Sequence, residues 1–361
     1  MNPRVANEAE IASPALLLLS ENIDANLRRM VEIAGGPARL RPHVKTHKLA
    51  PLVQRQVALG ITKYKCATIA EAEMTAGAGA GAVLLAFPCV GPNVARLVAL
   101  AGKFPAVQFG AVADDAEAVR ALGAAAAGAG VMIEVFIDLD CGMHRTGVEP
   151  GPRAVAVWRA IKQTCGLRAT GLHAYDGHIH EPDLAARRGH CDAAFAPVLA
   201  LRHHLGDVPL LAGGSPTFAL HAEHADRELS PGTTVLWDFG YADQFPDLPF
   251  APAAVLLTRV VSKPAPDRLC LDLGHNAVAA ENPPPRVRLL EIPDAVAVMQ
   301  SEEHLVVETP HASEFAIGAC LHGIPRHVCP TVALHSEAWL VEGGIARERW
   351  PILARARTLT I

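Results

Sequence analysis

Apolar runs of strand length alternate with amphipathic segments along the first two thirds of the chain. The runs predict β-strands, and the segments between them carry apolar residues at helical spacing. Asn93 and the pair Asp114-Asp115 stand where helix N-caps belong. The predicted strands are Ala15–Leu19, Leu40–Thr46, Tyr64–Ile69, Val83–Phe87, Val107–Val112, Met132–Leu139, Ala169–Tyr175 and Leu210–Ala212. The predicted helices include Glu21–Ile33, Ala70–Ala78, Asn93–Ala101 and Asp114–Ala127.

Eight strand–helix units in about 200 residues are typical of a TIM (β/α)8 barrel. A doubly wound sheet is the alternative, because strand order cannot be seen in a sequence. After residue 230 the helical pattern stops, and short apolar runs separated by Pro and Gly predict an antiparallel β domain. Those runs are Ala254–Val261, Leu269–Leu273, Ala295–Met299, His304–Val307, Thr331–Leu334 and Ala338–Val341. We therefore expect a barrel over residues 1–230 and a β domain over residues 231–361.

The composition indicates a compact globular protein rather than a nucleic-acid or membrane protein. Of the 361 residues, 50% are hydrophobic and 19% are charged, and the net charge is −5. A nucleic-acid-binding protein would carry a basic footprint, and no apolar run reaches the roughly 20 residues that span a bilayer. The first residues lack the pattern of a signal peptide, and the 8 cysteines are scattered without a CxxC pair, as free thiols are. These features favour a cytoplasmic protein.

The segment Arg41-Pro42-His43-Val44-Lys45-Thr46-His47-Lys48 carries the first candidate chemistry. If it is a strand, its odd-numbered residues share one basic face. Such a face attracts an anion, and the positive neighbours would lower the pKa of Lys45. A partly neutral lysine can attack a carbonyl, as in Schiff-base formation with pyridoxal phosphate, which is an anionic aldehyde. The alternative is a solvated basic loop or a nucleic-acid patch.

Polar clusters follow several predicted strands, at the end of the barrel where active sites lie. They are Asp138–Gly147 after the sixth strand, His173–His180 after the seventh and Gly213–Thr217 after the eighth. The last cluster suits a phosphate, because glycines let backbone N–H groups approach an anion and hydroxyls add donors. An ordinary turn has the same composition, and the agreement with Lys45 is what favours a phosphate site.

His327 and Cys329 form a candidate metal pair late in the chain. On an extended segment, side chains at i and i+2 point the same way, and an imidazole with a thiolate makes half of a zinc site. The alternative is a buried cysteine beside a surface histidine. His178 and His180 also alternate, so either could be a third ligand or a proton-transfer group.

Taken together, these motifs resemble the fold-type III pyridoxal-phosphate (PLP) enzymes, the alanine-racemase-like barrels. Within them the chain is most similar to the D-threonine aldolase and D-serine dehydratase branch. The matching segments run in order over nearly the whole chain, and the first and last are the most specific. They are Arg41–Lys48, Cys66–Glu73, Gly142–Val148, Gly171–Tyr175, Gly213–Thr217 and Pro325–Thr331.

The resemblance implies how a bound PLP would be held. Lys45 would form the internal aldimine with the cofactor. Arg145 would approach the phenolate oxygen, and Tyr175 would line the pyridine ring. The phosphate would be held by Gly214, Ser215 and Thr217.

The resemblance also implies a metal, a dimer and a substrate class. His327 and Cys329 would hold a divalent ion beside the β-hydroxyl of a small D-amino acid. The homodimer would place the β domain of one subunit over the barrel of the other. The implied reaction is the D-threonine aldolase type of lyase, which cleaves a β-hydroxy-D-amino acid to glycine and an aldehyde. The base would be metal-bound hydroxide or His180.

Two departures keep other reactions open. Known aldolases of the branch carry His-x-Asp at the metal position, whereas the dehydratases carry His-x-Cys, as here with Cys329. A thiolate favours zinc, and a carboxylate would favour manganese or magnesium. His173 stands where aldolase-like members often have glutamine. A D-serine or 3-hydroxy-D-aspartate dehydratase, which releases a 2-oxo acid and ammonia, is therefore the main alternative.

An amino-acid racemase and a non-catalytic PLP carrier are further alternatives. A racemase would need a second base from the β domain, and the only tyrosine in or near that half is Tyr241. The small carriers of this fold lack a β domain, so the roughly 130 residues expected here favour catalysis.

Overall fold

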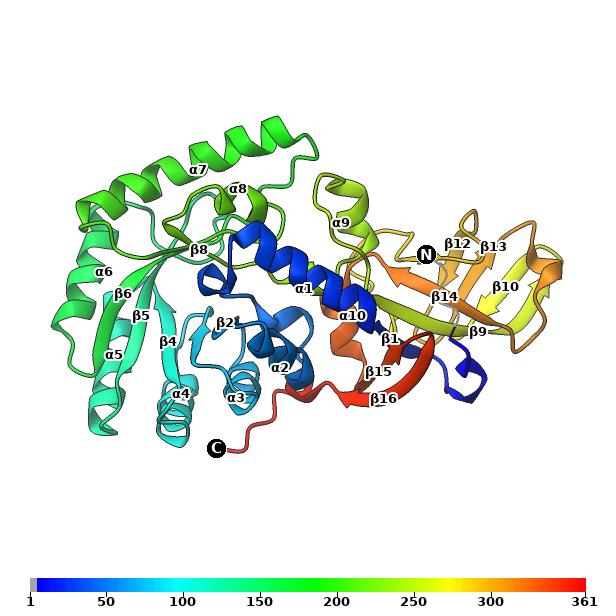
Figure 1. Cartoon of the computed structure of the whole chain (residues 1–361), viewed down its shortest axis with the longest axis horizontal. Coiled ribbons are helices and arrows are strands. Elements are labelled where there is room, and N and C mark those ends of the chain that lie inside the picture. Colours follow the sequence, from blue (N-terminus) through cyan, green and yellow to red (C-terminus); the bar gives the residue numbers. More distant parts are fainter. Residues whose placement is uncertain (1–4) are drawn as a thin grey trace. The chain divides into compact units, whose positions relative to one another are not determined.

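The protein divides into two compact units, each assembled from separate stretches of the chain (Figure 1). The computed structural model describes residues 5–361. The prediction that the first residues are not a signal peptide therefore falls partly outside the described residues. The barrel unit comprises Met30–Lys45, Leu49–Gly232 and Ala356–Ile361. The β unit comprises the residues up to Arg29 together with Thr46–Lys48 and Thr233–Arg355.

A parallel sheet of 7 strands forms the wall of the barrel unit, in the order β2-β3-β4-β5-β6-β7-β8. The strands are β2 (Lys63–Cys66), β3 (Ala82–Leu85), β4 (Gln108–Ala113), β5 (Ile133–Leu139), β6 (Leu167–Ala174), β7 (Leu210–Ala212) and β8 (Arg227–Leu229). The helices are α2 (Ala50–Ala58), α3 (Ile69–Gly77), α4 (Pro92–Lys103), α5 (Ala116–Gly128), α6 (Pro152–Gln163), α7 (Leu184–His204) and α8 (Phe218–Ala222). Neighbouring strands are parallel because each intervening helix returns the chain to the same end of the sheet.

The segment from Leu40 to His43 closes the ring between the two edge strands. Its ends form single parallel bridges with Leu229 of β8 and Lys65 of β2. The predicted TIM barrel is therefore confirmed, but the strand predicted at this place is reduced to those bridges. Pro42 has no N–H to donate to a neighbouring strand, and the chain then turns into a short 3-10 helix.

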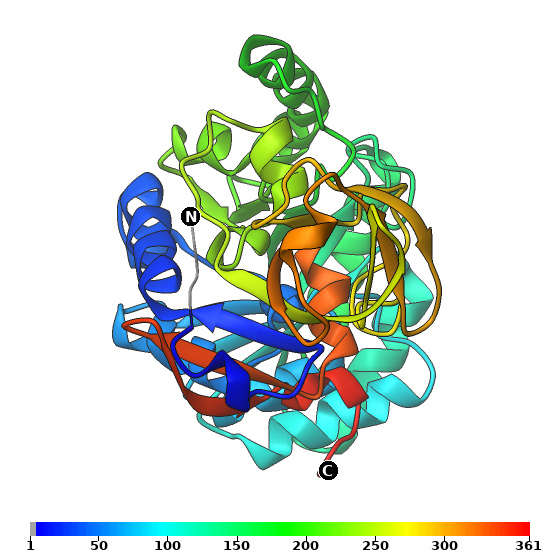
Figure 2. The ribbon, with the colours of Figure 1, turned by 90° about the vertical axis from the view of Figure 1, so that its right-hand side faces the viewer.

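Strand β1 (Ala15–Leu19) belongs to the β unit, so its prediction as the first barrel strand is wrong. It lies antiparallel to β9 and parallel to β15, and Figure 2 shows it in blue beside the red end of the chain. All five of its residues are buried. A strand that is buried on both faces has a continuous apolar run in either sheet, so its sequence does not reveal its partners.

The sheet of the β unit has 9 strands, with the order β12-β13-β10-β9-β1-β15-β16 and with β14 and β11 attached beside β9. All pairs except β1 with β15 are antiparallel. The other strands are β9 (Ala254–Ala265), β10 (Arg268–Leu271), β11 (Val287–Leu289), β12 (Val296–Gln300), β13 (Leu305–Glu308), β14 (Cys320–Pro325), β15 (Glu337–Glu342) and β16 (Ile345–Pro351). The helices are α9 (Phe239–Gln244) and α10 (Val328–Leu334), and α1 (Ser20–Ala34) begins in this unit. The 3-10 helices of the chain are η1 (Glu8–Glu10), η2 (Pro37–Arg39), η3 (Val44–Thr46), η4 (Thr233–Val235), η5 (Ala312–Glu314) and η6 (Leu353–Ala356).

A helix, α10, replaces the strand that the sequence predicted at residues 331–334. The helix begins directly after His327, its N-cap residue. The backbone N–H of Val328 donates to Oδ2 of Asp238 at 3.0 Å. Pro330 lies in the first turn, where the missing N–H breaks no helical hydrogen bond. The strand predicted here is therefore wrong, because a short apolar run has the same composition in a strand and in a helix.

Of the two predicted helix N-caps, the one of α5 is confirmed and the one of α4 is wrong. Oδ1 of Asp115 accepts the N–H groups of Glu117 and Ala118 at 2.8 and 2.9 Å, so this cap of α5 is confirmed. Asn93 lies inside α4, whose N-cap is Gly91, so that prediction is wrong.

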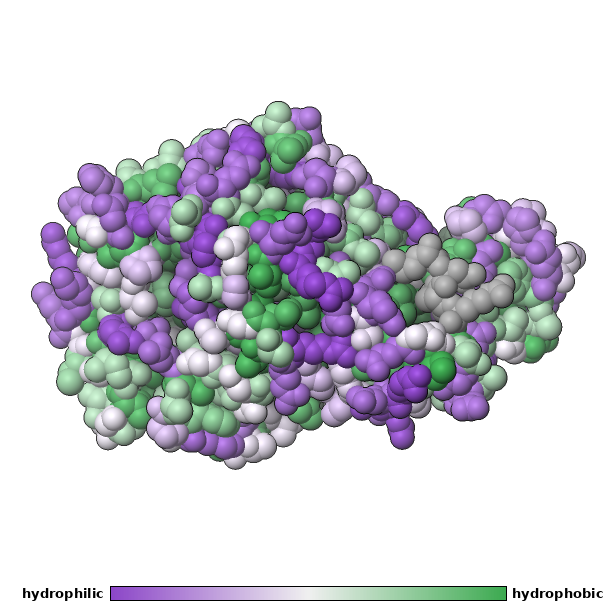
Figure 3. All heavy atoms as spheres, in the orientation of Figure 1, coloured by the Kyte–Doolittle hydropathy of each residue, from purple (hydrophilic) through white to green (hydrophobic). Residues whose placement is uncertain are grey.

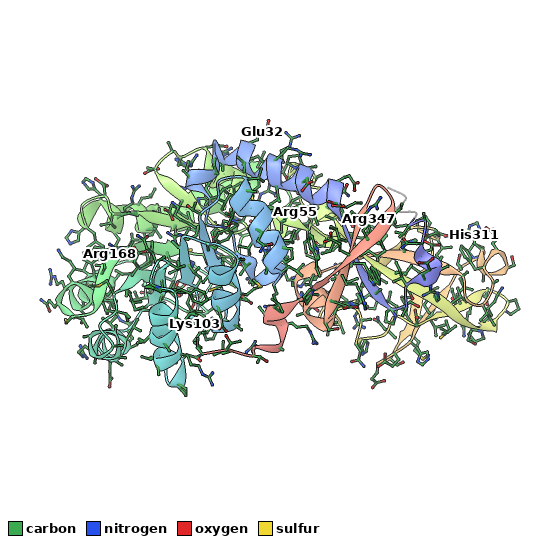
Figure 4. The ribbon with its side chains drawn as sticks, turned by 60° about the horizontal axis from the view of Figure 1, so that its bottom comes forward. Glu32, Arg55, Lys103, Arg168, His311 and Arg347 are labelled. Carbon is green, nitrogen blue, oxygen red and sulfur yellow. The ribbon has the colours of Figure 1, made fainter. Side chains whose placement is uncertain are left out.

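Several charged residues of the surface form ion pairs with their neighbours. Arg168 of β6, at the left of Figure 4, forms an ion pair with Glu134 of β5. His311 of the β unit lies 2.8 Å from Oε1 of Glu314. Hydrophilic and hydrophobic residues are interspersed over the face seen in Figure 3. Within residues 5–361, no helix has the length and apolar character needed to cross a membrane.

Candidate active site

Three cations gather around the ring of Tyr175 in the barrel unit. Lys45, in helix η3, places Nζ 5.6 Å from the ring centroid. Cζ of Arg145 lies 5.1 Å from the same point, and Nζ of Lys65 lies 5.5 Å from it. Side chains of one sign that converge on one place create a strong local potential. This part of the barrel therefore attracts an anion beside an amine.

The basic residues before Lys45 do not share a strand face with it, so that prediction is wrong. Arg41 is buried, and its Nε donates to Oε2 of Glu228 at 2.9 Å. Lys63 forms an ion pair with the other oxygen of the same carboxylate. Burial opposes ionisation of Glu228, but these two cations hold its pKa below the usual range. Nδ1 of His43 accepts the backbone N–H of Lys45 at 3.2 Å.

The loop after β7 has the close approaches expected of a phosphate cradle. Gly213 has a φ of +75°, and a Cβ there would lie 2.3 Å from Cδ2 of His221. At Gly214 a Cβ would lie 2.9 Å from Cε2 of Tyr175. Both positions therefore need glycine. The buried hydroxyls that follow are those of Ser215 and Thr217.

One hydrogen bond closes this loop on itself, and a second joins it to the segment after β8. The backbone N–H of Gly214 donates to Oγ1 of Thr217 at 3.4 Å. The N–H of Gly232 donates to Oγ of Ser215 at 3.2 Å. Phosphate sites of TIM barrels are frequently formed by the loops after the last two strands. The position of the loop therefore agrees with the predicted function of these residues.

A buried lysine that the sequence reasoning missed lies in the same unit. Lys65 of β2 is 2% exposed. Its Nζ lies 3.4 Å from Nε2 of His173, and Nδ1 of His173 lies 2.7 Å from Oδ1 of Asp138. The hydroxyl of Thr146 donates to Oδ2 of Asp138 at 2.9 Å. Burial opposes ionisation of Asp138, but these hydrogen bonds hold its pKa below the usual range.

The protonation states of Lys65, His173 and Asp138 follow from their surroundings. Burial, and after it the charge of Lys45, lower the pKa of Lys65 to about 7. Burial and the charge of Lys65 also lower the pKa of His173. The imidazole is therefore neutral, with Nδ1 donating to ionised Asp138 and Nε2 accepting from Lys65. The signal in the sequence is a second lysine two residues after Lys63 in a short strand.

One group of three metal-ligand side chains, Asp176, Cys191 and His221, occurs within residues 5–361. Nε2 of His221 lies 2.8 Å from Oδ2 of Asp176, and Arg227 donates to Nδ1 at 2.8 Å. Burial raises the pKa of Cys191 to about 12, which disfavours the thiolate that a metal needs. Both imidazole nitrogens are engaged and a guanidinium stands beside them. Hydrogen bonding therefore accounts for this group, which packs against the phosphate loop.

His327 and Cys329 lie together in the β unit. The predicted extended segment is wrong, since His327 caps α10 and Cys329 lies in its first turn. Nδ1 of His327 lies 2.6 Å from Oε1 of Glu281. Burial lowers the pKa of His327, but hydrogen bonds with Cys329 and Glu281 outweigh burial and raise it to about 9. A histidine oriented by a carboxylate, with a thiol beside it, fits a zinc ligand set.

The structure places several of the predicted cofactor-binding residues around one aromatic ring. Lys45, Arg145 and Gly214 all surround Tyr175. His180 is exposed in the segment between β6 and α7. Its predicted function as a base stays a prediction.

Comparison with known proteins supports one family. Residues 19–237 match the family of the alanine racemase N-terminal domain, and residues 253–341 match that of the serine dehydratase domain. The chain is 30% identical to a D-threonine aldolase of an Arthrobacter species, over 96% of this chain and 93% of that protein. The chain belongs to the fold-type III family of PLP enzymes.

Other fold-type III proteins match along nearly their whole length. A 3-hydroxy-D-aspartate aldolase of Paracoccus denitrificans is 27% identical over 97% of this chain and 94% of that protein. A D-threo-3-hydroxyaspartate dehydratase of Delftia sp. is 26% identical over 89% and 92%. The crystal structure of a D-threonine aldolase from Filomicrobium marinum superposes with a TM-score of 0.89 and 30% identity, covering 97% of this chain and 98% of that one. The aldolases and the dehydratase are lyases, so the chain belongs to a lyase branch of the family.

The residues of the barrel unit fit PLP, the cofactor that membership of the family implies. An amine for the aldehyde is present at Lys45, next to the aromatic ring of Tyr175. On the same ring, Gly214 leaves open a space that a Cβ would fill. Buried hydroxyls and backbone N–H groups follow directly, as a phosphate requires.

Proposed function

We propose that this protein is a PLP- and divalent-metal-dependent aldolase of the D-threonine aldolase type, which cleaves a β-hydroxy-D-amino acid to glycine and an aldehyde. The observation that carries the proposal is the arrangement around Tyr175. An amine, a guanidinium and a glycine cradle meet at one aromatic ring. The similarity to D-threonine aldolases along the whole chain supports the substrate class.

The barrel residues would bind and orient the cofactor. Lys45 would provide the amine for its aldehyde, Arg145 would bind its phenolate oxygen, and Tyr175 would pack on its pyridine ring. The phosphate is assigned to Gly214, Ser215 and Thr217. When bound, PLP supplies an electron sink for the charge left at Cα as a bond to that carbon breaks.

His327 and Cys329 are the proposed metal ligands. An imidazole and a thiolate favour zinc over manganese or magnesium. The ion would supply Lewis acidity for the substrate's β-hydroxyl. His180 is the proposed base that takes the proton of that hydroxyl, because its imidazole is exposed in the segment that follows β6 and precedes α7.

Cys329 favours a second candidate, a dehydratase that converts D-serine or 3-hydroxy-D-aspartate to a 2-oxo acid and ammonia. The dehydratases of the branch carry His-x-Cys at the metal position, as this chain does. Lys45 would then remove the proton at Cα, whereas in aldol cleavage that proton stays. The two reactions differ in which bond to Cα breaks.

Several further features are part of the proposal. We infer that the cofactor site is drawn from residues 1–230 and the metal site from residues 231–361. We also infer a homodimer, on the family resemblance, and a cytoplasmic location, on the scattered free cysteines. Light scattering of the purified protein tests the dimer.

A product assay separates the candidate functions. Protein loaded with PLP and with zinc or manganese is incubated with D-threonine, D-serine and L-threonine. We expect glycine and acetaldehyde from D-threonine alone, and we expect a chelator to stop the reaction and Lys45→Ala to abolish it. Ammonia and pyruvate from D-serine without glycine would replace the aldolase by the dehydratase. No turnover of any substrate would overturn the substrate class.

A further inference from the structure

Lys65 is a buried amine to which the proposed function gives no task. It extends from β2 to the same aromatic ring as Lys45, with the two Nζ atoms 5.5 and 5.6 Å from the centroid of Tyr175. Each amine therefore lies close to the place proposed for the cofactor ring. A buried lysine is unfavourable unless its charge is compensated or given up. A lysine buried inside the barrel therefore calls for a chemical explanation.

Burial lowers the pKa of Lys65, and the charged groups that face it, which come from several elements, act in both directions. Lys45 of η3 and Arg145 of the loop after β5 oppose its ammonium form, as burial does. Asp138 of β5 and Asp176 of the segment after β6 favour the ammonium form. The result is a pKa of about 7 for Lys65, so the amine and the ammonium are both populated at neutral pH. A group with this balance is suited to accept and return protons.

His173 and Asp138 fix the position of the Lys65 amine. The neutral imidazole accepts from Lys65 at 3.4 Å and donates to Asp138 at 2.7 Å. Asp138 in turn accepts from Thr146 at 2.9 Å. His173 and Asp138 are positioning residues, since they act on the reaction through Lys65.

We propose that Lys65 is a second acid–base residue of the cofactor site, which takes a proton from Lys45 before Lys45 attacks an aldehyde and returns it to the departing oxygen. The inference rests on the proposed function, in which Lys45 is the reacting amine. Lys45 begins as an ammonium with three N–H bonds and ends as a protonated C=N nitrogen with one. The carbonyl oxygen leaves as water with the two hydrogens, one of which passes through Lys65. Lys65 begins and ends as the neutral amine, so atoms and charge balance.

The test measures capture of the cofactor rather than turnover. Full-length protein freed of PLP is mixed with PLP in a stopped-flow instrument, and the visible absorption band is followed across a range of pH. For the unaltered protein we expect the rate to rise with pH through an inflection near 7. In Lys65→Arg, which keeps the charge but cannot lose its proton, and in Lys65→Met, we expect about a 100-fold slower capture at neutral pH. The inflection should be lost in both, and the final amplitude should be kept.

Lys63→Met is the matched control, because Lys63 lies two residues earlier on β2 and pairs with Glu228. It should capture PLP at the rate of the unaltered protein. Capture by Lys65→Arg at the unaltered rate and with the unaltered pH profile would overturn the inference. Should the Lys65 variants not fold, His173→Gln keeps the lysine but removes the imidazole, and an inflection that does not move in this variant would overturn it equally. A visible band that survives Lys45→Ala, or that never forms, would instead refute the proposed function.

Discussion

Nδ1 of His327 lies 2.6 Å from Oε1 of Glu281 in the β unit, so a carboxylate orients the histidine that we propose as a metal ligand. Outer-shell carboxylates of this kind typically contribute 10–100-fold to metal affinity. We therefore predict that Glu281→Gln weakens zinc binding by about 10-fold or more. Competition with a chromophoric chelator measures the affinity. Glu314→Gln, which removes the partner of His311, is the control, and equal affinities in the two variants would contradict the prediction.

The two groups of histidine and cysteine in the chain should differ in metal content. Cys191 belongs to a buried hydrogen-bonded group in which His221 is engaged at both nitrogens. Cys329 lies beside His327, whose carboxylate partner suits a ligand. We predict that Cys329→Ala loses most of the bound metal and that Cys191→Ala keeps it. Elemental analysis of protein purified with zinc present measures this, and the opposite result would move the metal to the barrel unit.

A side chain at position 213 should disturb the phosphate cradle. Gly213 has a φ of +75°, and a Cβ would lie 2.3 Å from the ring of His221. Alanine there must adopt a left-handed backbone conformation and displace a buried imidazole. We predict that Gly213→Ala costs about 1–3 kcal/mol of unfolding free energy and weakens PLP binding. Denaturant unfolding and a PLP titration measure the two effects. Gly189→Ala, inside α7 with open space around the added carbon, should raise the unfolding free energy by about 0.5–1 kcal/mol and leave PLP binding unchanged.

The buried amine of Lys65 should make stability depend on pH. Its folded-state pKa of about 7 lies below the ordinary value of 10.5, so the unfolded chain binds the extra proton between those values. The contribution of Lys65 to the unfolding free energy therefore rises with pH by about 1.4 kcal/mol per unit in that window, and it is most unfavourable below pH 7. We predict that Lys65→Met, without PLP, is more stable than the unaltered protein below pH 7. Urea unfolding should show this advantage shrinking toward pH 10, and a difference that does not vary with pH would contradict the prediction.

The sequence predicts the barrel well where strand and helix patterns are strong, and it fails where the chain has few apolar residues. Strands β3 to β6 have apolar runs, whereas β8 has the sequence Arg227-Glu228-Leu229 and was not predicted. The run at Ala15–Leu19 predicts a strand correctly, but buried strands of either sheet have the same pattern. Its partners are fixed by hydrogen bonds to segments more than two hundred residues away, which local periodicity does not encode.

The site was predicted through motifs, and its contacts became visible only in the structure. Lys45, Tyr175 and Gly214 could be singled out from the sequence, because their types and order match a known pattern. Lys65 and Glu281 could not, since a lysine in a strand and a glutamate in a loop are common. Lys65 is distinguished from other lysines by its burial, and Glu281 from other glutamates by its contact with His327.

The position of β1 in the β unit has a consequence for the growing chain on the ribosome. The strand is synthesised before every barrel strand, yet its register pairs Leu17 with Val255 on one side and with Trp339 on the other. All barrel strands are synthesised before either partner strand exists. Five consecutive buried apolar residues are therefore without their sheet for most of translation, and such a segment is prone to aggregate. Completion of the β unit is thus delayed until β15 has been made, and a chain that ends before β15 leaves one edge of β1 unpaired.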